Sequence, residues 1–195
     1  MDGAHWMASA LQAARAQLEI ATQNLANVST DGFRKAVARI ALTPRGLTVT
    51  SAPSREQGGI RQTGRPFDLA LAGEGAFRVG GVLTRDGAFS RDRDGFLVDD
   101  RGRKLQGEAG PVRVSAQGHV ERDGTVVDGG RIVARLPLPA GTTVVGGALE
   151  ASTVDAVAQT LAVLTAQRAF ETAQKTLVAI DGTRQRAVND VEKLA

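Results

Sequence analysis

Apolar residues recur through the N-terminal segment at alternating steps of four and three. Their positions are Met7, Leu11, Ala14, Leu18, Ala21, Leu25 and Val28. This spacing is typical of a coiled-coil seam and predicts an N-terminal helix. The opposite surface is polar and carries Ser9, Gln12, Gln17, Thr22 and Gln23, with Arg15 and Glu19 as its only charges. So little charge favours burial of this surface between neighbouring molecules; the alternative is an ordinary surface helix with a glutamine-rich side.

The C-terminal segment carries a second seam with the same steps. Its positions are Val163, Ala166, Phe170, Ala173, Leu177 and Ile180, then Arg184 as an interruption, then Ala187, Val191 and Leu194. The spacing predicts a helix from about 153 to 193, which would be about 60 Å long. Ser152 is the expected N-cap, and Asp155 can complete a capping box. We expect the two seams to meet.

Glycine and proline mark the middle of the chain as a different kind of structure. Of the 23 glycines, 20 lie between Gly46 and Gly147, and all 6 prolines lie between Pro44 and Pro139. Both residues interrupt helices, and Asp-Gly pairs such as Asp94-Gly95 are strong turn signals. The fold class is therefore α+β, with terminal helices that form a coiled-coil-like helical domain and a central all-β domain of short strands and hairpins.

The same patterns divide the chain into four segments. An N-terminal helix and turn occupy 1–35, and an irregular or partly extended connector follows at 36–66. The central β domain is expected at 67–140, and the C-terminal helix of the helical core at 141–195.

Composition limits the classes of function that are possible. The net charge is +3, but the middle of the chain is more basic than the rest, because residues 34–104 hold 14 Arg and Lys against 8 Asp and Glu. These arginines alternate with aspartates, as on a solvated hairpin surface, although a nucleic-acid groove is the alternative.

The absence of cysteine excludes disulfides, thiol catalysis and cysteine-bound zinc. The N-terminus has an acidic Asp2 and periodic apolar residues, which is typical of neither a secretory signal nor a membrane span.

No catalytic, metal or cofactor site is predicted. Residues 90–101 resemble a calcium loop at their start, but Arg101 stands where a bidentate glutamate is needed, so a hairpin explains them better. His5 and His119 are isolated from each other and from further histidines. We therefore expect no enzyme.

Four blocks of the sequence resemble segments of one known family. "QNLANVSTDGFRKA" resembles the N-terminal signature of bacterial flagellar rod and hook proteins, in which a helix ends in Asn-Leu/Ile-Ala-Asn before a polar turn, Gly and an aromatic residue. "GRPFDLALAGEGAFRV" and "LTRDGAFSRDRDGFLVDDRGRKLQG" are similar to the family's strand and hairpin segments. "LEASTVDAVAQTLAVLTAQRAFETAQKTL" is similar to its C-terminal helix. The chain departs from the family in its short length, its abbreviated connector and Ala76, which replaces an aromatic residue.

The resemblance implies a self-assembling structural subunit of the flagellar basal-body rod. The proximal rod is favoured, because distal-rod and hook proteins carry larger insertions. The implied partners are other copies of the chain, other rod and hook proteins and the flagellar export apparatus. The resemblance also implies export unfolded, without a cleaved signal peptide, to the periplasm-spanning rod, and neither nucleic-acid binding nor membrane insertion. Two alternatives stay open: a distal-rod or hook-like subunit, and a basic β module that binds nucleic acid or an acidic partner.

The resemblance also assigns roles to residues. The implied assembly seam consists of Leu11, Leu18, Leu25, Val28, Val163, Phe170, Leu177 and Ile180, and the helix-end turn motif of Asn24, Asn27, Gly32 and Phe33. Both asparagines are expected to bond exposed carbonyls at the helix end, and Gly32 to adopt a conformation closed to bulkier residues. The turn is expected to pack against Phe170 or Leu177.

Overall fold

The computed structural model describes residues 3–44 and 46–192, with side chains from 5 to 44 and from 46 to 186. The helices are α1 (Gly3–Ala26) and α2 (Ala156–Glu192). The strands are β1 (Ala36–Thr43), β2 (Gly46–Pro53), β3 (Ile60–Gln62), β4 (Leu69–Ala72), β5 (Phe77–Val79), β6 (Val82–Thr84), β7 (Ser90–Arg91), β8 (Leu97–Val98), β9 (Leu105–Gly107), β10 (Gly110–Pro111), β11 (His119–Val120), β12 (Thr125–Asp128), β13 (Arg131–Arg135), β14 (Thr143–Gly146) and β15 (Ala148–Glu150). In the described part of the chain, neither helix is apolar enough over a sufficient length to cross a membrane.

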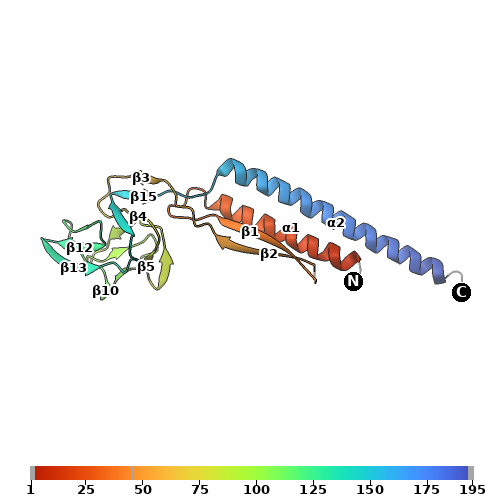
Figure 1. Ribbon diagram of the computed structural model, residues 1–195, viewed down its shortest axis with the longest axis horizontal. Coiled ribbons are helices and arrows are strands. Elements are labelled where there is room, and N and C mark those ends of the chain that lie inside the picture. The colour runs from red at the N-terminus through yellow and green to blue at the C-terminus, as the bar shows by residue number, and fades with distance from the viewer. Residues whose placement is uncertain (1–2, 45, 193–195) are drawn as a thin grey trace. The chain divides into compact units, whose positions relative to one another are not determined.

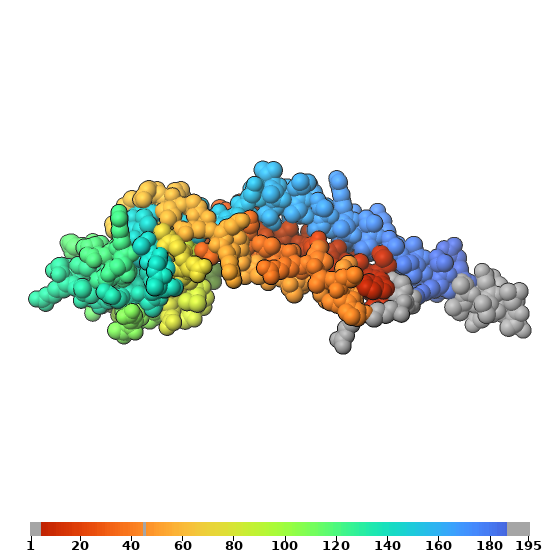
Figure 2. All heavy atoms as spheres, in the orientation of Figure 1, coloured from red at the N-terminus to blue at the C-terminus, as the bar shows by residue number. Residues whose placement is uncertain are grey.

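The chain forms two compact units, and the first, here called the helical unit, contains both helices and one hairpin. It comprises α1, β1, β2 and α2. The helices lie side by side and run in opposite directions, and β1 and β2 also contact α1 (Figure 1). In Figure 2 the hairpin, in orange, lies in front of much of α1, in red. The α+β class predicted from sequence is confirmed, with a helix near each end of the chain and short antiparallel strands between.

Small residues bring the two helices close together. Ala14 and Ala21 of α1 and Ala166 and Ala173 of α2 are buried seam positions. The larger seam side chains are half-buried: Met7, Leu11, Leu18 and Leu25 on α1, and Val163, Phe170, Leu177 and Ile180 on α2. The last three seam positions, Ala187, Val191 and Leu194, lie outside the described side chains.

Two expectations for the N-terminal seam and its opposite surface are wrong. Helix α1 ends at Ala26, so Val28 lies in the turn that follows and is not part of the helical stripe. Ser9, expected on the outer polar surface, is buried because the hairpin covers it. Its hydroxyl donates to Trp6 O at 2.8 Å and accepts from Leu47 N at 3.2 Å.

The segment expected to be an irregular or partly extended connector contains a regular hairpin. β1 and β2 pair antiparallel over eight residue pairs, with Ile40 opposite Val49 and Leu42 opposite Leu47. Little in the sequence indicates this hairpin, because apolar and polar residues do not alternate cleanly on β1. Both faces of β1 are largely exposed within the chain, so a solvent face and a core face are not distinguished.

The second unit, here called the β domain, is built from residues 27–34 and 55–153. Its strands form small antiparallel sheets around one apolar core, in which Phe77 and Phe89 meet edge to face with ring centroids 5.3 Å apart. The core consists of Leu69, Leu71, Phe77, Val79, Phe89, Leu97, Leu105, Val112, Val114, Val126, Leu136 and Val144. Residues 143–150, which the sequence grouped with the C-terminal helix, form β14 and β15 of this domain.

Helix α2 begins three residues later than expected, and with a different cap. Asp155 Oδ1 accepts hydrogen bonds from Val157 N at 2.9 Å and Ala158 N at 3.1 Å, so Asp155 is the N-cap. Ser152 Oγ instead donates to Asn27 O at 3.0 Å. The helix cannot start earlier because Thr153 N bonds Phe33 O at 3.0 Å, which holds this segment in the β domain.

Candidate assembly site

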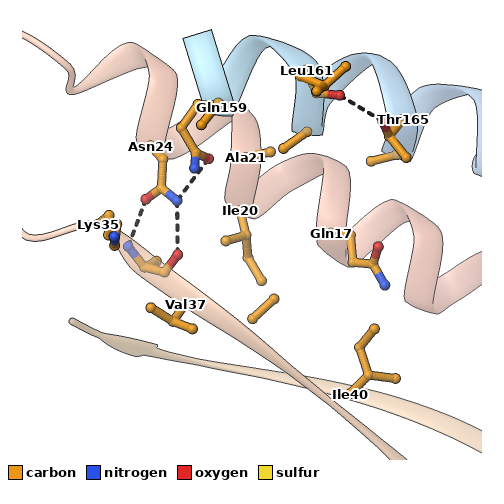
Figure 3. Close-up of a pocket in the computed structure, with 15 residues that line it drawn as sticks. Gln17, Ile20, Ala21, Asn24, Lys35, Val37, Ile40, Gln159, Leu161 and Thr165 are labelled. Atoms are coloured by element: carbon orange, nitrogen blue, oxygen red, sulfur yellow. Dashed lines mark hydrogen bonds between the residues drawn. The ribbon is translucent and has the colours of Figure 1, made fainter. Parts of the chain in front are cut away.

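Asn24 connects three elements of the helical unit. Its Oδ1 accepts from Ala36 N at 2.7 Å, and its Nδ2 donates to Ala36 O at 2.9 Å and to Gln159 Oε1 at 3.2 Å (Figure 3). The side chain is buried. The expectation that Asn24 bonds carbonyls at the end of its own helix is therefore wrong. Its amide instead bonds both backbone groups of the first residue of β1, as a neighbouring strand would.

A groove opens beside Asn24, between α1, β1 and α2. Its volume is about 600 Å³. Figure 3 shows Ile20 from α1, Val37 and Ile40 from β1, and Leu161 and Thr165 from α2 around it. The wall is formed mainly by apolar side chains and alanines, and its polar residues are Gln17, Asn24, Lys35, Gln159 and Thr165.

The lining of this groove is exposed to an unusual degree for large apolar side chains. Leu161 is 64% exposed, Ile40 55% and Val37 43%. Val157 and Leu164, one turn before and after Leu161 on the same face of α2, are also exposed. A contiguous apolar surface of this kind marks an interaction site more often than a solvent-facing one.

The second half of the signature block "QNLANVSTDGFRKA" folds into the β domain. Gly32 has φ 69°, as the sequence predicted, and its N–H donates to Glu150 O at 2.6 Å. A Cβ at this position would lie 2.3 Å from Arg85 C and 2.4 Å from Asp86 N. Only glycine fits here, because both the backbone conformation and the approach of another chain segment exclude a side chain.

A buried ion pair lies behind this glycine. Arg85 Nε donates to Glu150 Oε2 at 2.6 Å, and the two side chains are 5% and 1% exposed. The other guanidinium nitrogens of Arg85 donate to the carbonyls of Leu71, Gly73 and Gly75. Glu150 Oε1 accepts from Gly58 N at 3.0 Å. The attraction within the pair and its hydrogen bonds offset the cost of removing both charges from water, so the pair can hold four chain segments together.

Arg34 lies at the edge of the same cluster. Its Nε is 4.0 Å from Glu150 Oε1, which is beyond hydrogen-bond distance. Burial lowers the pKa of Arg34, and repulsion from Arg85 lowers it further, while Glu150 and Glu74 oppose the shift. Asp31 of the same turn pairs with Arg61 Nη2 at 3.2 Å.

All four blocks that carry the family resemblance therefore meet at one place. Gly32 comes from the first block, the carbonyls that accept from Arg85 come from the strand block, Arg85 from the hairpin block and Glu150 from the start of the C-terminal block. The ion pair explains why these positions hold Arg85 and Glu150, and the close approach of the backbone explains why position 32 holds glycine. Neither contact could be predicted from the spacing of residues along the chain.

The sequence-predicted residues are brought together only in part. Phe170 shares a surface depression with Leu11 and Leu18, in the middle of α1, so its nearest α1 partners differ from the helix-end turn expected to anchor it. Asn27 O accepts from Thr30 N at 3.2 Å, which closes the turn. Val37, Ile40 and Leu161 were not predicted as site residues. Leu161 could have been found from its spacing to Val157 and Leu164, which forms a second apolar stripe on α2.

The arrangement offers no evident chemistry among the described residues. They contain no group of three or more His, Asp or Glu side chains that could hold a metal ion. In the loop that resembles a calcium site, Asp92 Oδ1 accepts from Asp94 N at 3.0 Å and Phe96 N at 2.8 Å, so this carboxylate shapes a β-turn.

Comparison with known proteins gives matches at both ends of the chain and over most of its length. Residues 7–34 match the family described as "Flagella basal body rod protein", and residues 145–190 match "Flagellar basal body rod FlgEFG protein C-terminal". The chain is similar to the flagellar basal-body rod protein FlgF of Caulobacter vibrioides, with 29% identity over 92% of each protein. It is also similar to FlgF of Mesorhizobium japonicum, with 26% identity over 87% of this chain and 89% of the relative. FlgG of Agrobacterium fabrum is 26% identical over 89% of this chain and 93% of the relative.

Proposed function

Because the chain belongs to the flagellar rod and hook protein family, we propose that it is a structural subunit of the basal-body rod. The observation that carries the proposal is the apolar groove of the helical unit, lined by Val37, Ile40 and Leu161. Within a single chain, these side chains remain exposed. A subunit whose apolar surface is covered by further copies needs such a face, and a subunit that acts by contact needs no catalytic group.

In this proposal the terminal helices of neighbouring subunits pack into one layer with coiled-coil geometry. The buried alanines join α1 to α2 within the chain, and the second stripe on α2, formed by Val157, Leu161 and Leu164, faces a neighbour. This assignment differs from the simplest interpretation of the sequence, in which the predicted seams themselves pack against other copies of the chain. Other rod and hook proteins and the export apparatus are the further partners proposed.

We place the subunit in the proximal rod. The support is the short chain, because its 195 residues leave little room for the larger insertions of distal-rod and hook proteins. Electron microscopy of purified basal bodies carrying a labelled copy tests the position, and label in the distal rod or hook would contradict it.

Leu161→Asp tests the assembly surface itself. Since Leu161 is 64% exposed, the substitution should change the free energy of unfolding of the isolated chain by less than about 0.5 kcal/mol. In the assembled rod it would bury an unpaired charge, so incorporation into basal bodies should fall at least about 10-fold. Quantitative mass spectrometry of purified basal bodies measures the incorporation.

The matched control is Ala169→Asp, which adds the same charge at an exposed position of α2 outside the groove. Incorporation of this variant should remain close to that of the unaltered chain. Normal incorporation of Leu161→Asp, or an equal loss for both variants, would contradict the groove as the assembly surface.

A further inference from the structure

The β domain has a second groove, here called the arginine groove, which the rod proposal does not use. It lies between the β7–β8 hairpin, residues 111–115 and β13, and has a volume of about 580 Å³. Arg91, Arg93 and Arg113 line it, together with Val133. All three arginines are exposed.

None of these three arginines makes an ion pair within 4.0 Å among the described residues. Arg113 is held in place, because its Nε donates to Asp94 O at 2.7 Å and its guanidinium carbon lies 5.8 Å from the Phe96 ring centroid. Most of its N–H groups stay available for a ligand. Other arginines of the domain, such as Arg85 and Arg103, are paired with carboxylates.

Two carboxylates also line the arginine groove, and only one of them is fully engaged. Asp128 accepts from Ser115 Oγ at 2.6 Å and from Ser115 N at 2.8 Å. These two bonds from Ser115 lower the pKa of Asp128 against the opposing effect of burial, and Arg91 lowers it further. Asp94 is exposed at the rim. The groove therefore keeps a positive balance of one charge, three arginines against two aspartates.

One wall of the arginine groove is formed by Val133 of β13, which is the edge strand of its sheet. The three-stranded sheet has the order β11-β12-β13, so β13 is paired on one side only. Ile132 and Val133 are 69% and 46% exposed there. Among the described residues, β13 also accepts a backbone bond from outside its sheet, from Glu108 N to Arg135 O at 2.8 Å, at the C-terminal end of the strand. An edge with exposed β-branched residues is suited to pair with an added strand.

We propose that the arginine groove binds an extended, acidic polypeptide segment of another protein, which adds as a strand to β13. The backbone of the segment would pair with the strand edge, while its acidic side chains reach Arg91, Arg93 and Arg113. A second copy of this chain is a poor source, because nowhere in its sequence are three successive alternate positions all acidic. An alternative is that the arginines only protect the strand edge against aggregation. This would explain Arg131 and Arg135, which lie on β13 itself, but not the arginines of the groove, which come from two other segments of the chain.

A peptide of about seven residues that alternates Glu and Val, labelled with fluorescein, tests the proposal by fluorescence anisotropy with the full chain. The double variant Arg91→Glu, Arg93→Glu should bind about 10-fold more weakly, because two attractions become repulsions. The control Arg78→Glu, Arg122→Glu makes the same change of net charge at exposed arginines outside the groove and should bind within about 2-fold of the unaltered chain. An N-methylated peptide of the same sequence should lose binding, since it cannot donate to the strand edge.

Several results would overturn the proposal. These are no binding of the Glu–Val peptide, equal binding of a Lys–Val peptide, an equal loss for both double variants, and unchanged binding after N-methylation. Tighter binding of a single-stranded oligonucleotide with the same dependence on Arg91 and Arg93 would assign the groove to nucleic acid instead. The proposal is independent of the rod function, because none of these measurements involves assembly.

Discussion

The two units of the chain bury very different side chains. The β domain has a core of twelve Leu, Val and Phe residues, and five of its largest apolar side chains are less than 2% exposed: Phe77, Leu69, Leu71, Leu97 and Leu105. The helical unit buries mainly alanines, while Ile40, Val157 and Leu161 remain exposed. Because burial of large apolar side chains is the main source of stability, the β domain draws more of its stability from contacts within the single chain than the helical unit does.

Glu150→Ala tests how completely the β domain depends on its buried ion pair, and should have the largest effect. The substitution leaves the Arg85 guanidinium buried without its carboxylate partner, so the free energy of unfolding should fall by about 4 kcal/mol. Urea unfolding followed by circular dichroism measures the change. Glu108→Ala, at an exposed glutamate of the same domain, is the control and should cost less than about 0.5 kcal/mol. Similar values for the two variants would mean that the pair is not what holds the segments together.

Gly32→Ala tests how tightly the turn that follows α1 is packed in the β domain. Its methyl group would collide with the backbone of Arg85 and Asp86, in addition to the strain of a positive φ, so we expect a loss of about 3 kcal/mol. Gly64 has a similar φ of 73° but open space around it, and Gly64→Ala should cost only about 1 kcal/mol. The difference between the two, from the same unfolding measurement, isolates the steric contact. If both cost the same, that contact plays no part.

Asn24→Ala should have a smaller effect on unfolding than Glu150→Ala or Gly32→Ala, and should act on the helical unit alone. The backbone groups of Ala36 would lose both bonds, at a cost of about 2 kcal/mol. Hydrogen exchange measured by NMR should show the Ala36 amide exchanging about 30-fold faster, with the amides of the β domain unchanged. Thr22→Ala, at an exposed position of α1, should leave this exchange rate as it is. Faster exchange throughout the β domain would contradict its independence.

The sequence predicted the terminal helices well because their patterns are long and periodic. The family resemblance also implied that Gly32 adopts a conformation closed to bulkier residues, and its φ is 69°. The start of α2 was misplaced because Ser152 and Asp155 are both good caps. The choice between them depends on bonds from the β domain, such as that of Thr153 N to Phe33 O.

The hairpin and the groove could not be predicted from the sequence. β1 lacks the alternation of a half-buried strand, and its position is set by the contact of Asn24 with Ala36, which are 12 residues apart. Arg85 and Glu150 were not singled out because they are 65 residues apart and each sits in a motif that a turn or strand end explains. Long-range pairs of this kind leave no periodic signal.

The amide of Asn24 makes the number of residues in the loop between Asn24 and Ala36 important. It bonds both the N–H and the carbonyl of Ala36, so whichever residue occupies that position determines which way every later side chain of β1 faces. Because side chains alternate along a strand, one inserted residue before Ala36 would reverse the hairpin and turn Ile40 away from its present wall. Relatives that assemble with the same partners should therefore tolerate substitutions in this loop more readily than a change of a single residue in its count.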